Sequence, residues 1–159
     1  PILSSSTQQD MTTSFADFVA TQDARNDIQL RIREYTLMLC DALAQDFVHE
    51  SIKRCKFFAA NGSENKEHFE QRIQRLKNGE DHYKFYIESG RKYHKIWMET
   101  DDGSRSVHAF VDMKTGEVYK PASVKAPAKG VRYNLLIIKE REDILENCDW
   151  AGGYLYAKG

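Results

Sequence analysis

The chain has 159 residues, a length that corresponds to one domain. Hydrophobic residues make up 41% and charged residues 30%, which is typical of a globular protein in water. The 23 Lys and Arg balance 24 Asp and Glu, so a net charge of -1 excludes a strongly basic nucleic-acid coat and an acidic solvating tail. No apolar run approaches the roughly 18 residues that a membrane helix needs, so we expect no membrane contact.

The three cysteines, Cys40, Cys55 and Cys148, are an odd number at wide spacing, which is a poor disulfide framework. No C-x-x-C occurs, and no His and Cys stand together at the spacing of zinc ligands. The first residues also lack the charged and apolar regions of a signal peptide. We therefore expect reduced thiols in a cytoplasmic compartment, with no metal and no cofactor.

The domain organisation follows from a change of period. Residues 1–13 are rich in Ser, Thr and Gln, which indicates a mobile arm. Residues 14–159 are expected to form a single α+β domain. Apolar residues recur at helical spacing over 14–79, the helical part, and at a spacing of two from Tyr83, where the sheet part, 83–159, begins.

Three stretches of the helical part show the pattern of amphipathic helices. A first stretch begins near Ser14, and the clearest pattern covers about 23–47. That pattern either continues or kinks into 48–60. A last helix is expected to start with Ser63 as its N-cap and to end at Asn78-Gly79.

The sheet part is predicted to be an antiparallel meander with tight turns. Its four clear strands cover Tyr83–Glu88, Arg91–Thr100, Ser106–Asp112 and Glu117–Lys120. A fifth strand over 131–138, a short helix over 139–147 and a last edge strand within 149–156 are expected to follow. The predicted fold is α+β, with the N-terminal helices packed on one face of a four- to five-stranded antiparallel meander, then a short C-terminal helix and a terminal strand.

The turns predict which side chains share a face of the sheet. If 89–90 and 102–103 are two-residue turns, the cross-strand pairs include Phe85 with His94, Met98 with Val107, and Ile96 with Ala109. The core face then collects Tyr83, Phe85, Ile87, His94, Ile96, Met98, Val107, Ala109, Val111 and Val118. The outer face collects Lys84, Tyr86, Tyr93, Lys95, Trp97, Glu99, His108, Phe110, Asp112 and Tyr119.

The outer face is unusual because aromatic rings stand among basic side chains. The candidate binding surface consists of Tyr86, Tyr93, Lys95, Trp97, His108, Phe110 and Tyr119. A candidate basic patch beside it consists of Lys114, Lys120, Lys125, Lys129 and Arg132. Such a surface suits single-stranded nucleic acid, whose bases stack on rings and whose phosphates bind cations.

Two other interpretations of this face stay open. In the first, the C-terminal segment covers it, with Trp150, Tyr154 and Tyr156 packed on Trp97 and Phe110. In the second, another subunit or a protein partner covers it, because exposed aromatic patches commonly mark interfaces.

No group of residues has the spacing of a catalytic site. Cys55 and His49 are six positions apart on a predicted helix and point in different directions. His94 is expected in the core, and His108 and Asp112 are about 13 Å apart along a strand. No phosphate-binding glycine motif occurs. We expect no catalytic residue, and an enzyme, the third hypothesis, would require a pocket that the sequence does not show.

Three segments carry a resemblance to a known group of proteins. They read VHAFVDMKTGEVYKPA from Val107, APAKGVRYNL from Ala126 and DWAGGYLY from Asp149. Together they resemble small uncharacterised proteins encoded by tailed bacteriophages. The resemblance covers the C-terminal third to half of the chain, and it implies a host cytoplasm or virion location without implying an activity.

The sequence therefore favours a non-enzymatic phage-type protein that acts through protein–protein contacts. It is expected to be a virion component, an assembly factor or a host-directed accessory protein, with Trp97 and Phe110 as contact anchors and self-association as one outcome. The alternative is a single-stranded nucleic-acid-binding protein that uses the aromatic and basic sheet face. Nucleic-acid affinity falls steeply with salt, whereas an apolar interface is much less sensitive to it.

Overall fold

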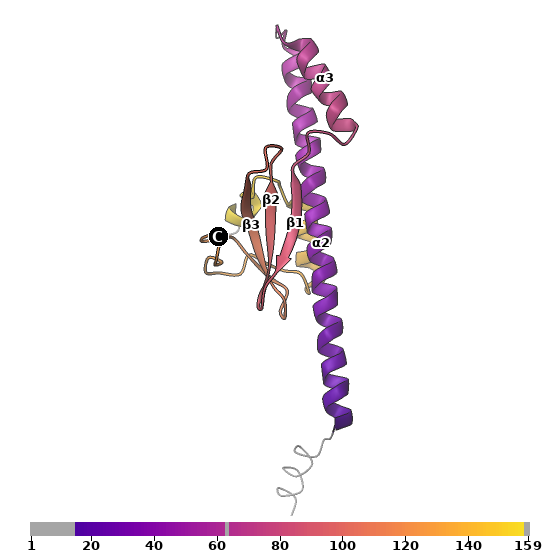
Figure 1. Ribbon diagram of the computed structural model, residues 1–159, viewed down its shortest axis with the longest axis vertical. Helices are drawn as coiled ribbons and strands as arrows, with labels where there is room; N and C mark the ends of the chain where they lie inside the picture. The colour runs from indigo at the N-terminus through magenta and orange to yellow at the C-terminus, as the bar shows by residue number, and fades with distance from the viewer. Residues whose placement is uncertain (1–14, 63, 158–159) are drawn as a thin grey trace, which may run out of the picture.

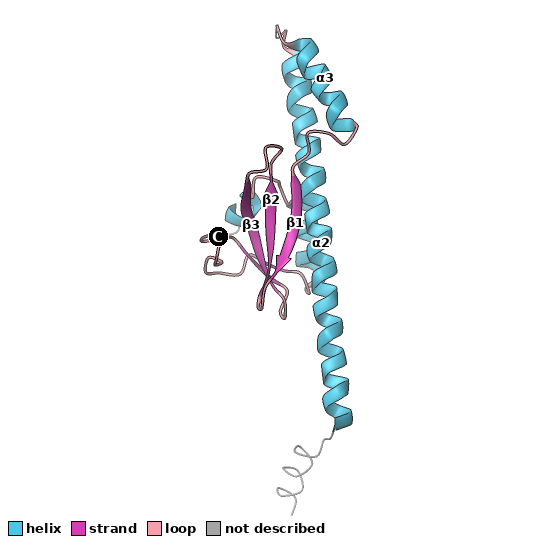
Figure 2. Ribbon diagram, in the orientation of Figure 1, coloured by secondary structure: helices cyan, strands magenta, loops and turns pink. Residues whose placement is uncertain are grey.

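The structure is a computed structural model that describes residues 15–62 and 64–157 (Figures 1 and 2). It confirms the α+β fold, with an antiparallel sheet in the order β1-β2-β3-β4-β5. The predicted mobile arm and the Ser63 cap lie outside the described residues. The elements are α2 (Phe15–Ala60), α3 (Lys66–Lys77), β1 (Lys84–Ser89), β2 (Tyr93–Glu99), β3 (Arg105–Asp112), β4 (Glu117–Tyr119), β5 (Tyr133–Asn134), α4 (Ile138–Asn147) and α5 (Gly153–Ala157).

Helix α2 is continuous over 46 residues, so the pattern over 23–47 extends without a break into 48–60. At 1.5 Å per residue its length is about 69 Å. One stripe of α2 is buried, with its members at steps of one, three and four: Ile32, Thr36, Leu39, Cys40, Leu43, Phe47, Ser51, Cys55 and Ala59. No residue of 15–31 is buried, so α2 docks only through the part that follows.

The two ends of α2 extend past the sheet in opposite directions (Figure 1). At the C-terminal end, α3 folds back along α2 as a helical hairpin, and the ring centroids of Phe58 and Phe69 lie 5.3 Å apart. The hairpin helix ends at Asn78-Gly79 as predicted, with Gly79 in the left-handed conformation at φ 85°. At the other end, residues 15–31 extend past the sheet without a buried residue among them, and we call this segment the overhang.

The register of the sheet agrees with the prediction only in part. Ile96 pairs with Ala109 as predicted, but Phe85 pairs with Met98 and not with His94. The connection between β1 and β2 takes residues 90–92, so it is longer than the predicted turn. The resulting shift is an even number of residues, and for this reason β1 keeps its predicted faces.

A β-bulge in β3 changes the prediction at its centre. The register shifts between Ile96 and Trp97, so that Trp97 pairs with Val107 and Met98 pairs with Ser106 instead of Val107. His108 is the extra residue and has no partner in the ladder.

The C-terminal segment forms helices where a strand was predicted. β5 has only two residues, α4 begins one residue before its expected start, and the terminal edge strand is wrong because 153–157 is helical. The cause is Asp149, whose carboxylate accepts hydrogen bonds from the backbone N–H groups of Gly153 (3.0 Å) and Tyr154 (2.9 Å). This cap directs the chain into a helical turn.

One core joins all the layers. Helices α2, α4 and α5 cover the same face of the sheet, and α4 and α5 lie behind it in Figure 1. The cluster draws Leu39 and Leu43 from α2, Ile96 and Val111 from the sheet, and Ile144 from α4. The overall arrangement is therefore a helix-covered sheet whose longest helix extends beyond it at both ends.

We expect Leu43→Ala to lower the free energy of unfolding by about 2–5 kcal/mol, because it leaves a cavity in this core. Met38→Ala is the matched control on the exposed side of α2 and should change it by less than about 0.5 kcal/mol. Chemical denaturation measures both. Equal effects of the two substitutions would contradict the assignment of the buried stripe.

Candidate functional site

The centre of the outer sheet face is covered by its own cations. The side chains of Trp97 and Phe110 are only 5% and 1% exposed. The Lys95 ammonium lies 5.2 Å from the Trp97 ring centroid and 5.7 Å from that of Phe110, and the Arg105 guanidinium lies 4.1 Å from the Trp97 ring. Neither ring is therefore open for a base to stack on, nor free as an exposed anchor.

Around this centre the structure brings most of the predicted surface together. The Tyr93 ring meets Phe110 edge-on at 5.7 Å and Tyr119 at 6.2 Å. The Tyr86 hydroxyl donates to Glu99 at 3.4 Å and accepts from Arg105 Nη1 at 3.3 Å. Trp97 Nε1 is buried without a hydrogen-bond partner among the described residues. The outer face is therefore a network in which aromatic rings and cations of the same face contact one another.

His108 does not belong to this network, and its predicted place on the outer face is wrong. The bulge turns its ring to the core side, where it lies 5.5 Å from the Phe85 ring. His108 Nε2 also makes a 2.8 Å hydrogen bond with the Tyr154 hydroxyl. Burial lowers the pKa of His108 to about 4, although the negative charge of Asp149 acts to raise it. Burial also raises the pKa of Tyr154. The pair is neutral and structural.

The C-terminal aromatic residues do not cover the outer face, so that interpretation is also wrong. Trp150 meets the Phe47 ring edge-on at 5.4 Å and the Tyr83 ring at 5.7 Å. Tyr154 packs on His108 in the core, and Tyr156 lies under the Lys120 ammonium at 4.6 Å. These contacts secure α5 and the 148–152 segment to the core side.

The candidate basic patch divides between two places. Lys120, Lys125, Lys129 and Arg132 lie in or beside the loop between β4 and β5, where Arg132 Nε is buried without a hydrogen-bond partner among the described residues. Lys114 lies in the β3–β4 turn, at the opposite end of β4 from Lys120. The structure therefore separates Lys114 from the other four.

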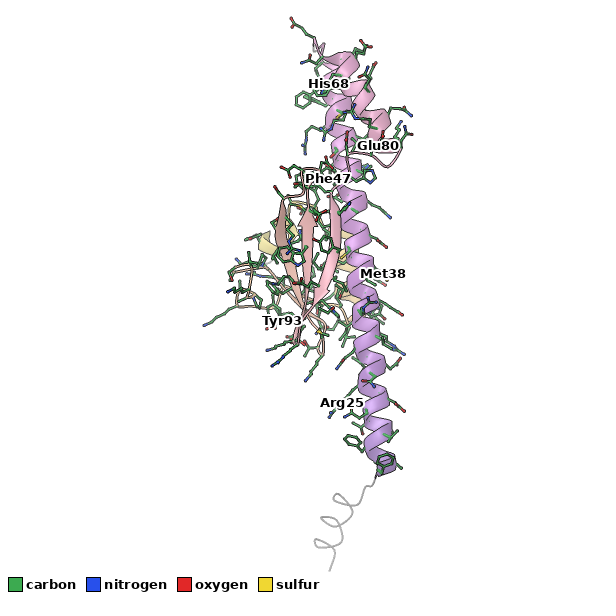
Figure 3. The ribbon with its side chains drawn as sticks, viewed as in Figure 1. Arg25, Met38, Phe47, His68, Glu80 and Tyr93 are labelled. Atoms are coloured by element: carbon green, nitrogen blue, oxygen red, sulfur yellow. The ribbon has the colours of Figure 1, made fainter. Side chains whose placement is uncertain are left out.

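Lys114 lines a cleft that sequence reasoning did not identify. The cleft has a volume of about 620 Å³ and lies between the overhang and the β3–β4 turn. We call it the junction cleft, and its lining residues are Gln22, Arg25, Asn26, Ile28, Gln29 and Lys114. A second compartment of about 370 Å³ shares Asn26 and Gln29 with it and adds Leu30, Arg33, His94 and Met113. Figure 3 shows Arg25 on the part of α2 beyond the sheet, and Tyr93 at the end of the sheet nearest to it.

A sequence signal for the junction cleft did exist. Continued toward the N-terminus, the buried stripe of α2 passes through Gln29, Arg25 and Gln22. Polar residues at stripe positions keep the helix from packing on the body, and this leaves the cleft open. The apolar residues of the overhang are exposed, and Phe15 and Phe18 at its tip are 81% and 59% exposed.

The described residues show no cluster placed to bind a metal, and two of their cysteines are unsuited to nucleophilic chemistry. Within 15–62 and 64–157 no group of three or more His, Cys, Asp and Glu is placed to hold a metal ion. Burial raises the pKa of Cys40 to about 12 and that of Cys148 to about 11, which disfavours their nucleophilic thiolates. In the same part of the chain, no helix is both long and apolar enough to cross a membrane.

The buried His108 predicts a pH dependence of stability. Its pKa is about 4 when folded and about 6.5 when unfolded, so between these values the unfolded chain takes up a proton that the folded protein does not. The free energy of unfolding therefore falls by about 3 kcal/mol as the pH decreases from above 6.5 toward 4. Burial and Arg33 lower the pKa of His94 in the same direction.

Two measurements check this prediction. NMR titration should give a His108 pKa well below 5, and a value near 6.5 would contradict its burial. In His108→Gln the free energy of unfolding should decrease less steeply between pH 6.5 and 4 than in the unsubstituted protein.

The comparisons with known proteins identify a family but not an activity. No curated protein and no solved structure matches the chain. A family model described as "Family of unknown function (DUF7717)" matches residues 15–157, which include both helical ends and the whole sheet. The match spans most of the chain, and the protein therefore belongs to this family.

Proposed function

We propose that this chain is a non-enzymatic protein-binding protein that acts through the overhang of α2, and that its partner is a second copy of the chain. The observation that carries the proposal is the exposure of Phe15 and Phe18 where the described part of α2 begins, beyond the sheet. The resemblance to tailed-phage proteins supports a role as a virion component, an assembly factor or a host-directed accessory protein, in the virion or the host cytoplasm.

The physics of the overhang supports a protein partner. Most helical stability in proteins comes from packing of an apolar face. Among the described residues the overhang buries no such face, and its stripe positions are polar where it passes the sheet. Burying each Phe side chain against a partner contributes about 1.5–3 kcal/mol to the free energy of binding. A partner at the tip therefore stabilises both the helical conformation of the overhang and the complex.

The order of charges along the overhang favours a second copy in antiparallel orientation. Asp17 and Asp23 lie toward the tip, and Arg31 lies toward the sheet. Two antiparallel overhangs place Asp17 of one chain near Arg31 of the other, whereas parallel overhangs place like charges together. Arg31 pairs with Asp27 of its own helix at 3.2 Å, but both side chains are more than half exposed and remain accessible.

We expect the purified chain to associate with increasing concentration, and Phe15→Ser with Phe18→Ser to abolish this association. Light scattering coupled to size-exclusion chromatography measures the molar mass. Val124→Ser, which removes an exposed apolar side chain from the β4–β5 loop, is the matched control and should leave the mass unchanged. A monomer at every concentration, or a doubly substituted chain that associates normally, would refute the proposal.

A charge exchange tests the orientation of the pair. Asp17→Arg should weaken association because it places a positive charge against Arg31 of the other chain, and adding Arg31→Asp in the same chain should restore it. Restoration is expected only if the two helices are antiparallel, since in a parallel pair each of these positions faces its own copy. Failure of the second substitution to restore association would contradict the antiparallel arrangement.

A further inference from the structure

We propose that the junction cleft binds a nucleotide, either free or within a single-stranded nucleic acid, with its phosphate between Arg25 and Lys114. The site uses other residues than the apolar tip of the overhang and the outer sheet face, although its Arg25 lies within the segment along which the two copies are proposed to pair. Three features of the cleft favour such a ligand: its charge, the polar side chains that line it and the apolar compartment beside it.

No carboxylate within residues 15–62 and 64–157 neutralises the cations of the junction cleft. None of the described residues that line either compartment is acidic. Arg25, Lys114 and Arg33 form no ion pair with any residue in 15–62 or 64–157. Cations that line one cleft without a carboxylate partner repel one another, and an anion bound between them relieves this repulsion. Phosphate is the anion that Arg and Lys bind in nucleic acids.

The polar lining adds hydrogen-bonding capacity beside the cations. The carboxamides of Gln22, Asn26 and Gln29 face the cleft from successive turns of α2. Their side chains make no hydrogen bond within the described part of the chain. A carboxamide offers both donors and acceptors, which suits the edges of nucleobases as well as phosphate oxygens.

The second compartment extends the site in a way that fits a base. Leu30 and Met113 supply apolar surface there, next to the shared Asn26 and Gln29. His94 also lines it but adds no positive charge at neutral pH, because burial and Arg33 lower its pKa. A cationic compartment that adjoins an apolar one matches a nucleotide, in which a phosphate is joined to a flat, largely apolar ring system. The volumes of both compartments lie in the range of small-molecule sites.

The outer sheet face is the weaker place for a nucleotide. Its cations already lie over Trp97 and Phe110, and stacking a base there requires removing them from the rings. The junction cleft requires no such rearrangement. The cations of the cleft are exposed and are not held by other described side chains. A bound nucleotide therefore displaces only water from them.

The test is a fluorescence titration of the full chain with a labelled single-stranded oligothymidylate at low salt. Arg25→Gln with Lys114→Gln should weaken binding by about tenfold and reduce the dependence of log K on log salt by about 0.7, the effect of losing the one phosphate that they share. Lys125→Gln with Lys129→Gln removes the same charge from the β4–β5 loop and should change the affinity less than twofold. Circular dichroism checks that the fold is retained, and molar mass measured on the same samples separates a loss of nucleotide binding from a change in association.

Competition experiments identify the ligand and test the apolar compartment. Displacement by thymidine monophosphate as well as by unlabelled oligothymidylate supports a free nucleotide as ligand, and displacement by the oligonucleotide alone supports a nucleic acid. Leu30→Ala should weaken the binding of thymidine monophosphate and oligothymidylate but leave the binding of inorganic triphosphate unchanged. Displacement by polyglutamate as effective as by oligothymidylate, an equal loss in the loop control, or no binding at low salt would each overturn the proposal.

Discussion

Leu39 and Leu43 of α2 share one buried cluster with Ile96 and Val111 of the sheet, and this contact determines where everything else lies. It requires that α2 cross the sheet with its apolar stripe facing inward, from Ile32 onward. Because α2 is far longer than any strand, docking at this one place leaves both of its ends outside the sheet. The overhang and the helical hairpin are consequences of this docking.

The same contact explains why the two candidate surfaces at the overhang differ in character. Where the stripe is apolar the helix is buried, and where it becomes polar at Gln29, Arg25 and Gln22 the helix separates from the body. The polar positions then line a cleft against the β3–β4 turn, while the apolar residues at the tip remain in water. One change in residue type along a helix thus produces both a cationic cleft and an exposed apolar tip.

Two small irregularities in the sheet determine on which face individual side chains lie. A longer β1–β2 connection shifted the register by an even number of positions and left the faces of β1 as predicted. The bulge in β3 changed the register beyond Ile96, and it moved His108 from the outer face into a buried hydrogen bond with Tyr154. A bulge is a single extra residue, and alternation of side chains alone does not reveal it.

The local patterns of the sequence determined the element types: the helical period up to Asn78-Gly79, the period of two from Tyr83 and the helix near 139–147 are all present. These patterns reflect which face each segment buries, and that information is local. The tertiary structure alone decided that Lys95 and Arg105 cover Trp97, that Asp149 caps a terminal helix and that Lys114 and Arg25 line one cleft. Each of these depends on residues that are distant in the chain or on the exact course of the backbone, because contacts between elements arise only after the elements have packed.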